Sequence, residues 1–147
     1  MISFTGCDLS VFVDTNILIY SFDRLDKRKH EAAVDLLTEL VEKNEIIVSA
    51  QVINEFIVVM ISKVTHPLSL EKVESYINKF RQVFNVCPIE MADCIKALSI
   101  LKRYRFNYWD SLIVAAALKS GCSTLYTEDM QDGQIIEKKL KIINPFS

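Results

Sequence analysis

The alternation of hydrophobic and polar residues along the chain predicts strands and helices that follow one another. Short β-branched runs predict strands, and apolar residues at three- and four-residue spacing predict helices. We expect strands at 11–13, 45–48, 86–89, 122–126 and 141–143. We expect helices at 17–22, about 24–41, after Ser49, at 69–84, 91–105 and 107–120, and a short one near 133–138. This alternation is typical of an α/β fold around a mostly parallel sheet.

The apolar spacing also predicts which helical faces are buried. The inward residues of four helices are expected to be Ala32, Ala33, Leu36, Leu37, Leu40 and Val41; Val52, Ile53, Phe56, Ile57, Met60 and Ile61; Ile95, Leu98 and Leu101; and most of 112–118. The last of these segments is apolar on nearly every side, which predicts a helix buried against the sheet.

The composition of the chain favours a globular domain. Its 147 residues, half of them hydrophobic, suit one domain spanning 1–147, and three glycines and three prolines argue against a loop-rich chain. The net charge of −2 counts mildly against a polyanion binder. It does not exclude an enzyme that holds its substrate through a metal.

The cysteines and the apolar runs bear on location and partners. No Cys-x-x-Cys pair occurs and neither histidine is near a cysteine, so we expect free thiols in a reducing cytosol rather than a zinc site at Cys7, Cys87, Cys94 and Cys122. The early Asp8 and Asp14 do not suit a signal peptide. The longest apolar runs fall short of the ~20 residues of a membrane span. We expect a soluble, cytoplasmic protein without membrane contact.

Four acids lie at the ends of the expected elements. Asp14 directly follows the strand at 11–13, and Asp129 follows the strand at 122–126. Glu55 lies in the second turn of the helix after Ser49, and Asp110 lies in the first turn of the helix after Asn107. Because ligands bind at the carboxyl ends of parallel strands, we expect these four side chains to meet at one edge of the sheet.

Each acid also has a structural explanation. Asp14 or Asn16 suits a helix cap, Asp110 suits a capping partner of Asn107, Glu55 suits a solvent-facing position, and Asp129 suits a surface turn with Asp132 and Gly133. Among nineteen acids, one or two near a given edge are expected by chance. The convergence of four from distant places favours a functional site.

Clustered carboxylates imply a cation. They repel one another, and burial raises their pKa unless a positive charge compensates. Oxygen ligands without nearby His or Cys favour Mg²⁺ or Mn²⁺. Such ions lower the pKa of bound water and neutralise charge on a phosphoryl group during in-line attack.

Four segments carry a resemblance to a known family: Asp14-Thr15-Asn16, Asn54-Glu55-Phe56, Trp109-Asp110-Ser111-Leu112-Ile113 and Tyr126-Thr127-Glu128-Asp129. In order and spacing the chain resembles the PIN-domain ribonucleases over nearly its full length, most closely the VapC-type toxins of bacterial type II toxin–antitoxin pairs. The segment from Asp129 to Gly133 and the ending Asn144-Pro145-Phe146 resemble one bacterial branch of these toxins. The ten residues before the first strand are longer than usual in that family.

The resemblance implies a three-layer α/β/α sandwich that hydrolyses single-stranded RNA with divalent metal. It implies Asp14 and Asp110 as principal metal ligands, Glu55 as a further ligand or a residue that orients water, and Asp129 as a ligand of a second ion or a ligand through water. Thr15, Asn16 and Thr127 would support them by hydrogen bonds, and Asp132 is a less certain fifth acid. The family also implies homodimers and a small antitoxin that plugs the acidic groove, often with an Arg.

Other polar and aromatic residues are weaker candidates for contacts with a nucleic-acid substrate. Residues 102–109 interleave basic and aromatic side chains, a pattern typical of single-strand binding, although we favour core packing for Tyr104, Phe106 and Trp109. A second group of basic residues could contact phosphate, although we favour a solvated helix start for them: Arg24, Lys27, Arg28 and Lys29. We expect structural or surface roles for His30 and His66.

Two other classes of protein compete with a nuclease. A non-catalytic PIN-like scaffold that binds RNA or a protein would most simply show a degraded acidic quartet, and this quartet is intact. A phosphoacceptor signalling domain needs an acid before the acceptor, where Val13 stands, and a lysine after a late strand, where none directly follows Tyr126. Together with the resemblance, the intact quartet leads us to expect a Mg²⁺-dependent endoribonuclease, the toxin of a toxin–antitoxin pair.

Overall fold

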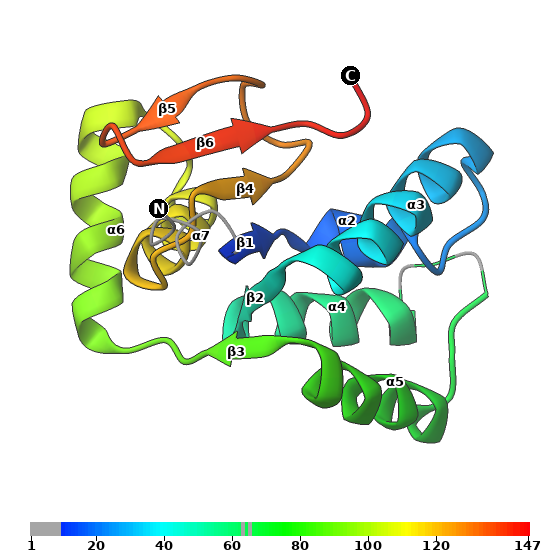
Figure 1. Ribbon diagram of the computed structural model, residues 1–147. Coiled ribbons are helices and arrows are strands. Elements are labelled where there is room, and N and C mark those ends of the chain that lie inside the picture. Colours follow the sequence, from blue (N-terminus) through cyan, green and yellow to red (C-terminus); the bar gives the residue numbers. More distant parts are fainter. Residues whose placement is uncertain (1–9, 63, 65) are drawn as a thin grey trace.

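The computed structural model describes residues 10–62, 64 and 66–147 (Figure 1). The strands are β1 (Ser10–Val13), β2 (Glu45–Ser49), β3 (Asn85–Cys87), β4 (Thr124–Tyr126), β5 (Ile135–Ile136) and β6 (Leu140–Ile143). The helices are α2 (Thr15–Tyr20), α3 (Lys27–Lys43), α4 (Ala50–Ser62), α5 (Leu70–Val83), α6 (Met91–Tyr104) and α7 (Tyr108–Lys119). The expectations for Cys7 and Asp8 fall outside the described residues.

The six strands form one sheet in the order β3-β2-β1-β4-β6-β5. All neighbouring strands are parallel except β5 and β6. The chain steps from β1 through β2 to β3, then returns through α6 and α7 to β4 on the other side of β1. Right-handed crossovers in these two directions place α2–α5 on one face and α6–α7 on the other. The predicted α/β sandwich with a mostly parallel sheet is confirmed.

From β1 the strands are added first toward β3 and then, after β3, on the other side of β1 from β4 onward, which makes the parallel pair β1 and β4 the switch point of the sheet. Their register is Phe12 opposite Leu125 and Val13 opposite Tyr126. The pairing continues one residue further, because the Asp14 N–H donates to the Tyr126 carbonyl at 3.0 Å. Crevices for ligands form at such a switch point, beyond the carboxyl ends of the strands.

The centre of the sheet and the helix α7 lie in the core, to which the other helices also contribute. Residues 11–13 of β1 and 46–48 of β2 are buried, and so is every residue from Ser111 to Ala117. The predicted burial of this apolar helix is confirmed. The Ser49 hydroxyl accepts from the Val52 N–H at 3.3 Å, so the predicted start of α4 is also confirmed.

The predicted short helix near 133–138 is wrong, because this segment is part of a β-hairpin. Strand β5 pairs with β6, and the turn between them closes through a 3.0 Å hydrogen bond from the Lys139 N–H to the Ile136 carbonyl. Its central residues Glu137 and Lys138 have φ angles of 51° and 60°. Two successive left-handed residues cannot continue a right-handed helix, and they suit a tight hairpin turn.

The predicted buried face of α6 is also wrong for Ile95 and Leu98, which are 63% and 59% exposed. The buried face instead contains Ala97 and Ile100. Ala97 clusters with Leu112 and Ala115 of α7, and its small side chain allows the two helices to pack closely. Similarly, Val41 of α3 is exposed, although the spacing predicted it to be inward.

No helix in the part of the chain that the structure describes combines the length and the apolar character needed to cross a membrane.

Candidate active site

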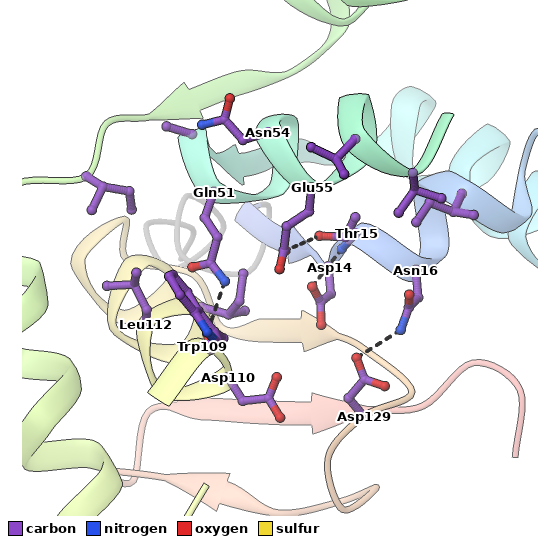
Figure 2. Close-up of a pocket in the computed structure, with 16 residues that line it drawn as sticks. Asp14, Thr15, Asn16, Gln51, Asn54, Glu55, Trp109, Asp110, Leu112 and Asp129 are labelled. Atoms are coloured by element: carbon purple, nitrogen blue, oxygen red, sulfur yellow. Dashed lines mark hydrogen bonds between the residues drawn. The ribbon is translucent and has the colours of Figure 1, made fainter. Parts of the chain in front are cut away.

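A cavity of about 670 Å³ opens at the carboxyl edge of β1 and β4, and all four predicted acids line it (Figure 2). The four come from the end of β1, from α4, from the start of α7 and from the segment after β4. The described residues in its wall are Asp14, Thr15, Asn16, Ile19, Ala50, Gln51, Asn54, Glu55, Val58, Val59, Ile89, Trp109, Asp110, Leu112, Ile113 and Asp129.

Asp14 is the most buried of the four acids, with 4% of its surface exposed. It is the N-cap residue of α2: Oδ1 accepts from the Thr15 N–H at 2.6 Å, and Oδ2 accepts from the Thr127 hydroxyl at 2.7 Å. Burial raises its pKa to about 7; the two hydrogen bonds oppose this, and the charges of Asp129 and Glu55 add to it. The capping role and a place at the cavity therefore coexist in one side chain.

Glu55 and Asp129 lie on opposite sides of α2 and are held by its first two residues. The Thr15 hydroxyl donates to Glu55 Oε1 at 2.8 Å, and the Asn16 amide donates to Asp129 Oδ2 at 2.9 Å. Burial raises the pKa of Asp129, Glu128 and Glu55 raise it further, and Lys29 lowers it in part. Figure 2 shows Glu55 turned toward Asp14 rather than away from the cavity.

Asp110 is anchored by the cap of α7. Asn107 Oδ1 accepts from the Asp110 N–H at 2.8 Å, and Asn107 Nδ2 donates to Asp110 Oδ2 at 3.1 Å. Burial raises the pKa of Asp110 to about 6; the charge of Asp129 adds to this, the Asn107 hydrogen bond opposes it, and Glu55 adds further. Asn107 rather than Asp110 is the capping residue, so the carboxylate is left facing the cavity.

The cavity lacks a compensating positive charge. None of the described residues in its wall is a lysine, arginine or histidine. The cation that lowers the pKa of Asp129 is Lys29, which lies outside the cavity wall and whose ammonium donates to Glu128 at 2.9 Å. In the absence of a cation, each acid takes hydrogen bonds from neutral donors, as expected for carboxylates that repel one another.

The four acids do not form a preorganised metal site. Among the described residues, no three carboxylate, imidazole or thiol groups are close enough to hold an ion as they stand. The donor set nevertheless suits a hard divalent cation, because all four groups offer carboxylate oxygens. The raised pKa values of Asp14 and Asp110 add a physical reason, since a bound cation would favour their charged forms.

Asp132, the possible fifth acid, lies outside the cavity wall. Its Oδ1 accepts from the Asn144 N–H at 2.8 Å, which ties the segment after β4 to the end of β6.

The basic residues at the start of α3 also have structural partners. Arg28 donates to the Phe146 carbonyl at 3.1 Å, and Lys29 pairs with Glu128. These contacts connect α3 to the C-terminal part of the fold.

The histidines have no connection with the cavity. His30 Nδ1 lies 2.8 Å from the Tyr20 carbonyl, which gives it a structural contact, and His66 is exposed.

The aromatic residues 104, 106 and 109 differ in their roles. Tyr104 and Phe106 stack with ring centroids 6.0 Å apart and pack on the core, as favoured from the sequence. Trp109 does not: it is 60% exposed and lines the cavity.

Gln51 was not predicted as a site residue, and Asn54 was named only within a family-like segment without a role, yet both line the cavity from α4. A signal for them was present. Gln51 lies three residues before Asn54 and four before Glu55, so Gln51 and Asn54 share one helical face with Glu55.

An acidic cavity at the switch point of a mostly parallel sheet is typical of α/β domains that bind a ligand at the carboxyl ends of their strands. The model of the PIN domain family matches residues 11–131, and the chain belongs to this family. No curated protein sequence matches the chain.

Several solved structures have a similar fold. The sarcin–ricin-loop-cleaving toxin VapC20 of Mycobacterium tuberculosis has a TM-score of 0.62 and 19% identity, over 78% of this chain and 86% of that one. A toxin–antitoxin complex from Klebsiella pneumoniae has a TM-score of 0.63 and 19% identity, over 92% and 97%. DNA-bound VapBC from Salmonella typhimurium has a TM-score of 0.61 and 19% identity, over 91% and 96%. At such identities the similarity shows the fold.

Proposed function

We propose that this protein is a divalent-metal-dependent endoribonuclease that cuts single-stranded RNA, and that it is the toxin of a toxin–antitoxin pair. The observation that carries the proposal is the cavity of four carboxylates, two with strongly raised pKa values, without a cation in its described wall. The family match and the similarity to VapC20, described as a sarcin–ricin-loop-cleaving toxin, support it.

We assign a role in the reaction to each of the four acids from its position in the cavity. A bound Mg²⁺ or Mn²⁺ would supply an activated water and neutralise charge on the phosphate. Asp14 and Asp110 would be its principal ligands. Glu55 would complete the shell or orient the attacking water, and Asp129 would bind a second ion or bind through water. Thr15, Asn16 and Thr127 hold these carboxylates by the hydrogen bonds described above.

The test is cleavage of a labelled single-stranded RNA panel by the purified protein, with Mg²⁺ or Mn²⁺ against EDTA. We expect cutting that needs the metal and that is lost in Asp14→Asn and Asp110→Asn. Asp132→Asn is the matched control, because Asp132 lies in the same segment as Asp129 but outside the cavity wall.

Two results would contradict the proposal. Cutting that survives both cavity substitutions would point to a contaminating nuclease. RNA binding without cutting, at full metal occupancy, would favour a non-catalytic scaffold.

The partners form part of the proposal. Toxin–antitoxin complexes are among the similar structures, which supports a small antitoxin as partner, and we propose that this chain acts in the cytoplasm. A basic antitoxin side chain would suit the acidic cavity. We also propose a homodimer, supported by Met91, Ile95 and Leu98, which form an exposed apolar row on α6. Light scattering tests it: Ile95→Glu should shift a dimer to monomer, and a monomeric wild type would contradict it.

A further inference from the structure

The side chain of Gln51 has an unused hydrogen-bond acceptor in the wall of the cavity. Gln51 is 8% exposed, and its Nε2 donates to the Trp109 carbonyl at 3.2 Å. This bond fixes which end of the amide is nitrogen. The other end, Oε1, is buried and has no hydrogen-bond partner among the described residues. An unpaired buried acceptor costs free energy, so an N–H group that reaches Oε1 from the cavity would be favoured.

Beside Gln51 the cavity has an aromatic wall. Trp109 is 60% exposed, and its ring meets the Tyr108 ring edge-on at a centroid distance of 5.4 Å. Figure 2 shows Trp109 next to Gln51 and Leu112, on the side of the cavity away from Asn16 and Asp129. Ile89 and Leu112 also line the cavity. The cavity therefore has an acidic part and an apolar, aromatic part.

We propose that the aromatic part is a nucleobase site, in which an unpaired base stacks on Trp109 and donates an N–H to Gln51 Oε1. This inference rests on the proposed function and extends it: the occupant is a base near the phosphate that is cut. Because Oε1 is buried, the base reaches it only when the Gln51 amide turns, which exchanges the 3.2 Å bond from Nε2 to the Trp109 carbonyl for the bond from the base to Oε1.

The chemistry of this region favours a base over other occupants. A base offers a flat face for the indole ring and an N–H on its edge, and aromatic stacking is the usual way in which single strands are held. The cavity volume, about 670 Å³, lies within the ~300–1,000 Å³ typical of small-molecule sites, so it has room for more than an ion. The acids disfavour an anionic group that lacks a metal, whereas a base is neutral.

Fluorescence provides a test that does not need RNA cleavage. Trp109 is the sole tryptophan of the chain, so its emission reports on this site alone. The full-length protein is titrated with AMP in the presence of Mg²⁺, with ribose 5-phosphate as the base-free control and N-acetyltryptophanamide as the control for absorption and collisional quenching. We expect saturable quenching by AMP and none by ribose 5-phosphate.

The hydrogen bond to Gln51 is tested with a matched pair of ligands. Purine riboside 5′-monophosphate has the purine ring of AMP without the amino group, so it has no N–H on the base. We expect it to bind about five-fold more weakly than AMP. In Gln51→Met this difference should disappear while quenching remains. Because one half of the comparison changes only the ligand, it stands even if the variant folds poorly.

The role of Trp109 in RNA cutting is tested by mapping the cut sites. Trp109→Phe keeps an aromatic face and should keep the wild-type base preference next to the cut. Trp109→Ala should relax this preference and raise KM more than it lowers kcat. A merely structural role would leave the base preference unchanged.

The outcomes separate this inference from the proposed function. Saturable quenching that depends on the amino group, in a protein that cuts no RNA, would support the base site and reject the nuclease. RNA cutting without any saturable quenching by AMP would overturn the base site and leave the nuclease. Quenching by a basic peptide but not by AMP would overturn it in favour of a protein-binding surface.

Discussion

Two aspartates of this protein have the same small exposed surface but differ in depth, in hydrogen-bond partners and in pKa. Asp14 and Asp93 are each 4% exposed. Burial acts to raise the pKa of Asp93, but the Lys119 ammonium 2.7 Å from Oδ2, together with the Glu90 N–H, lowers it below its usual value. Asp14 has only neutral donors, and its pKa rises to about 7.

The difference shows that a small exposed surface alone does not mark a candidate site: Asp14 lies deeper in the protein than Asp93 and also lacks a counter-charge. Asp93 has its partner within the fold, and it fastens the start of α6 to the end of α7. Asp14 is costly to ionise in the folded protein, and two further carboxylates add to the cost. Unpaired titratable groups of this kind cluster at functional sites, where a ligand completes them.

The largest expected effect is on activity. Asp14→Asn should lower the RNA cleavage rate on the order of 10³-fold or more, because it removes a metal ligand at the reacting centre. Asp93→Asn should leave the rate within a small factor of wild type. Initial rates on one RNA substrate at saturating Mg²⁺ measure both. Equal losses of cleavage rate in Asp14→Asn and Asp93→Asn would contradict the assignment of the active site to the cavity around Asp14.

Metal binding should stabilise the protein only through the Asp14 cavity. At an ion concentration of 100 times Kd, mass action predicts a gain of about 2.7 kcal/mol in the free energy of unfolding. Thermal unfolding with Mn²⁺ against EDTA measures the gain. It should vanish in Asp14→Asn and remain in Asp93→Asn. A gain that persists in Asp14→Asn would place the ion elsewhere.

The two aspartates should give stability opposite dependences on pH. The folded pKa of Asp14 is above its unfolded value of 3.8, so the metal-free protein binds extra protons when folded and loses stability as the pH rises from about 4 to 7. Asp110 acts in the same direction up to about pH 6. The folded pKa of Asp93 is lowered, so its contribution is present above the unfolded pKa and is lost as the pH falls.

Urea unfolding in EDTA at pH 5 and pH 8 tests this dependence. We expect the free energy of unfolding to be lower at pH 8, by on the order of 2 kcal/mol. Asp14→Asn should flatten the dependence, because asparagine is neutral at both values. A wild type that is more stable at pH 8 would contradict the assignment.

The smallest expected effect is on stability at Asp93. Asp93→Asn removes the charge that pairs with Lys119, whose side chain is 35% exposed, so we expect a loss of about 1–2 kcal/mol in the free energy of unfolding. Lys119→Met should cost a similar amount, and the double variant should show that the two losses are not additive. Chemical denaturation at pH 7 measures all three proteins.

The candidate site could be predicted from the sequence because its acids lie next to recognisable ends of strands and helices. Asp14 ends a β-branched run, and Asp110 follows the capping Asn107, so topology alone places both at one edge. Gln51 and Trp109 were missed as a pair because their relation depends on how the start of α4 meets the start of α7. Spacing within one helix does not contain that information.

The wrong faces and the missing hairpin have similar causes. The row of Met91, Ile95 and Leu98 has the spacing of a buried stripe, and only the close contact of Ala97 with α7 shows that α6 turns its other side inward. The hairpin at β5 depends on two left-handed residues, Glu137 and Lys138, which are neither glycine nor asparagine. Such conformations are rarely visible in a sequence.

The ends of the sheet have a consequence for self-association. In the described part of the chain, its outermost strands β3 and β5 are three and two residues long. Strands this short offer few free backbone groups, so they are poor templates for adding a strand from another molecule. Two copies of this chain are therefore expected to meet through side chains on their helices, and the sheet should resist growth into fibrils even at high concentration.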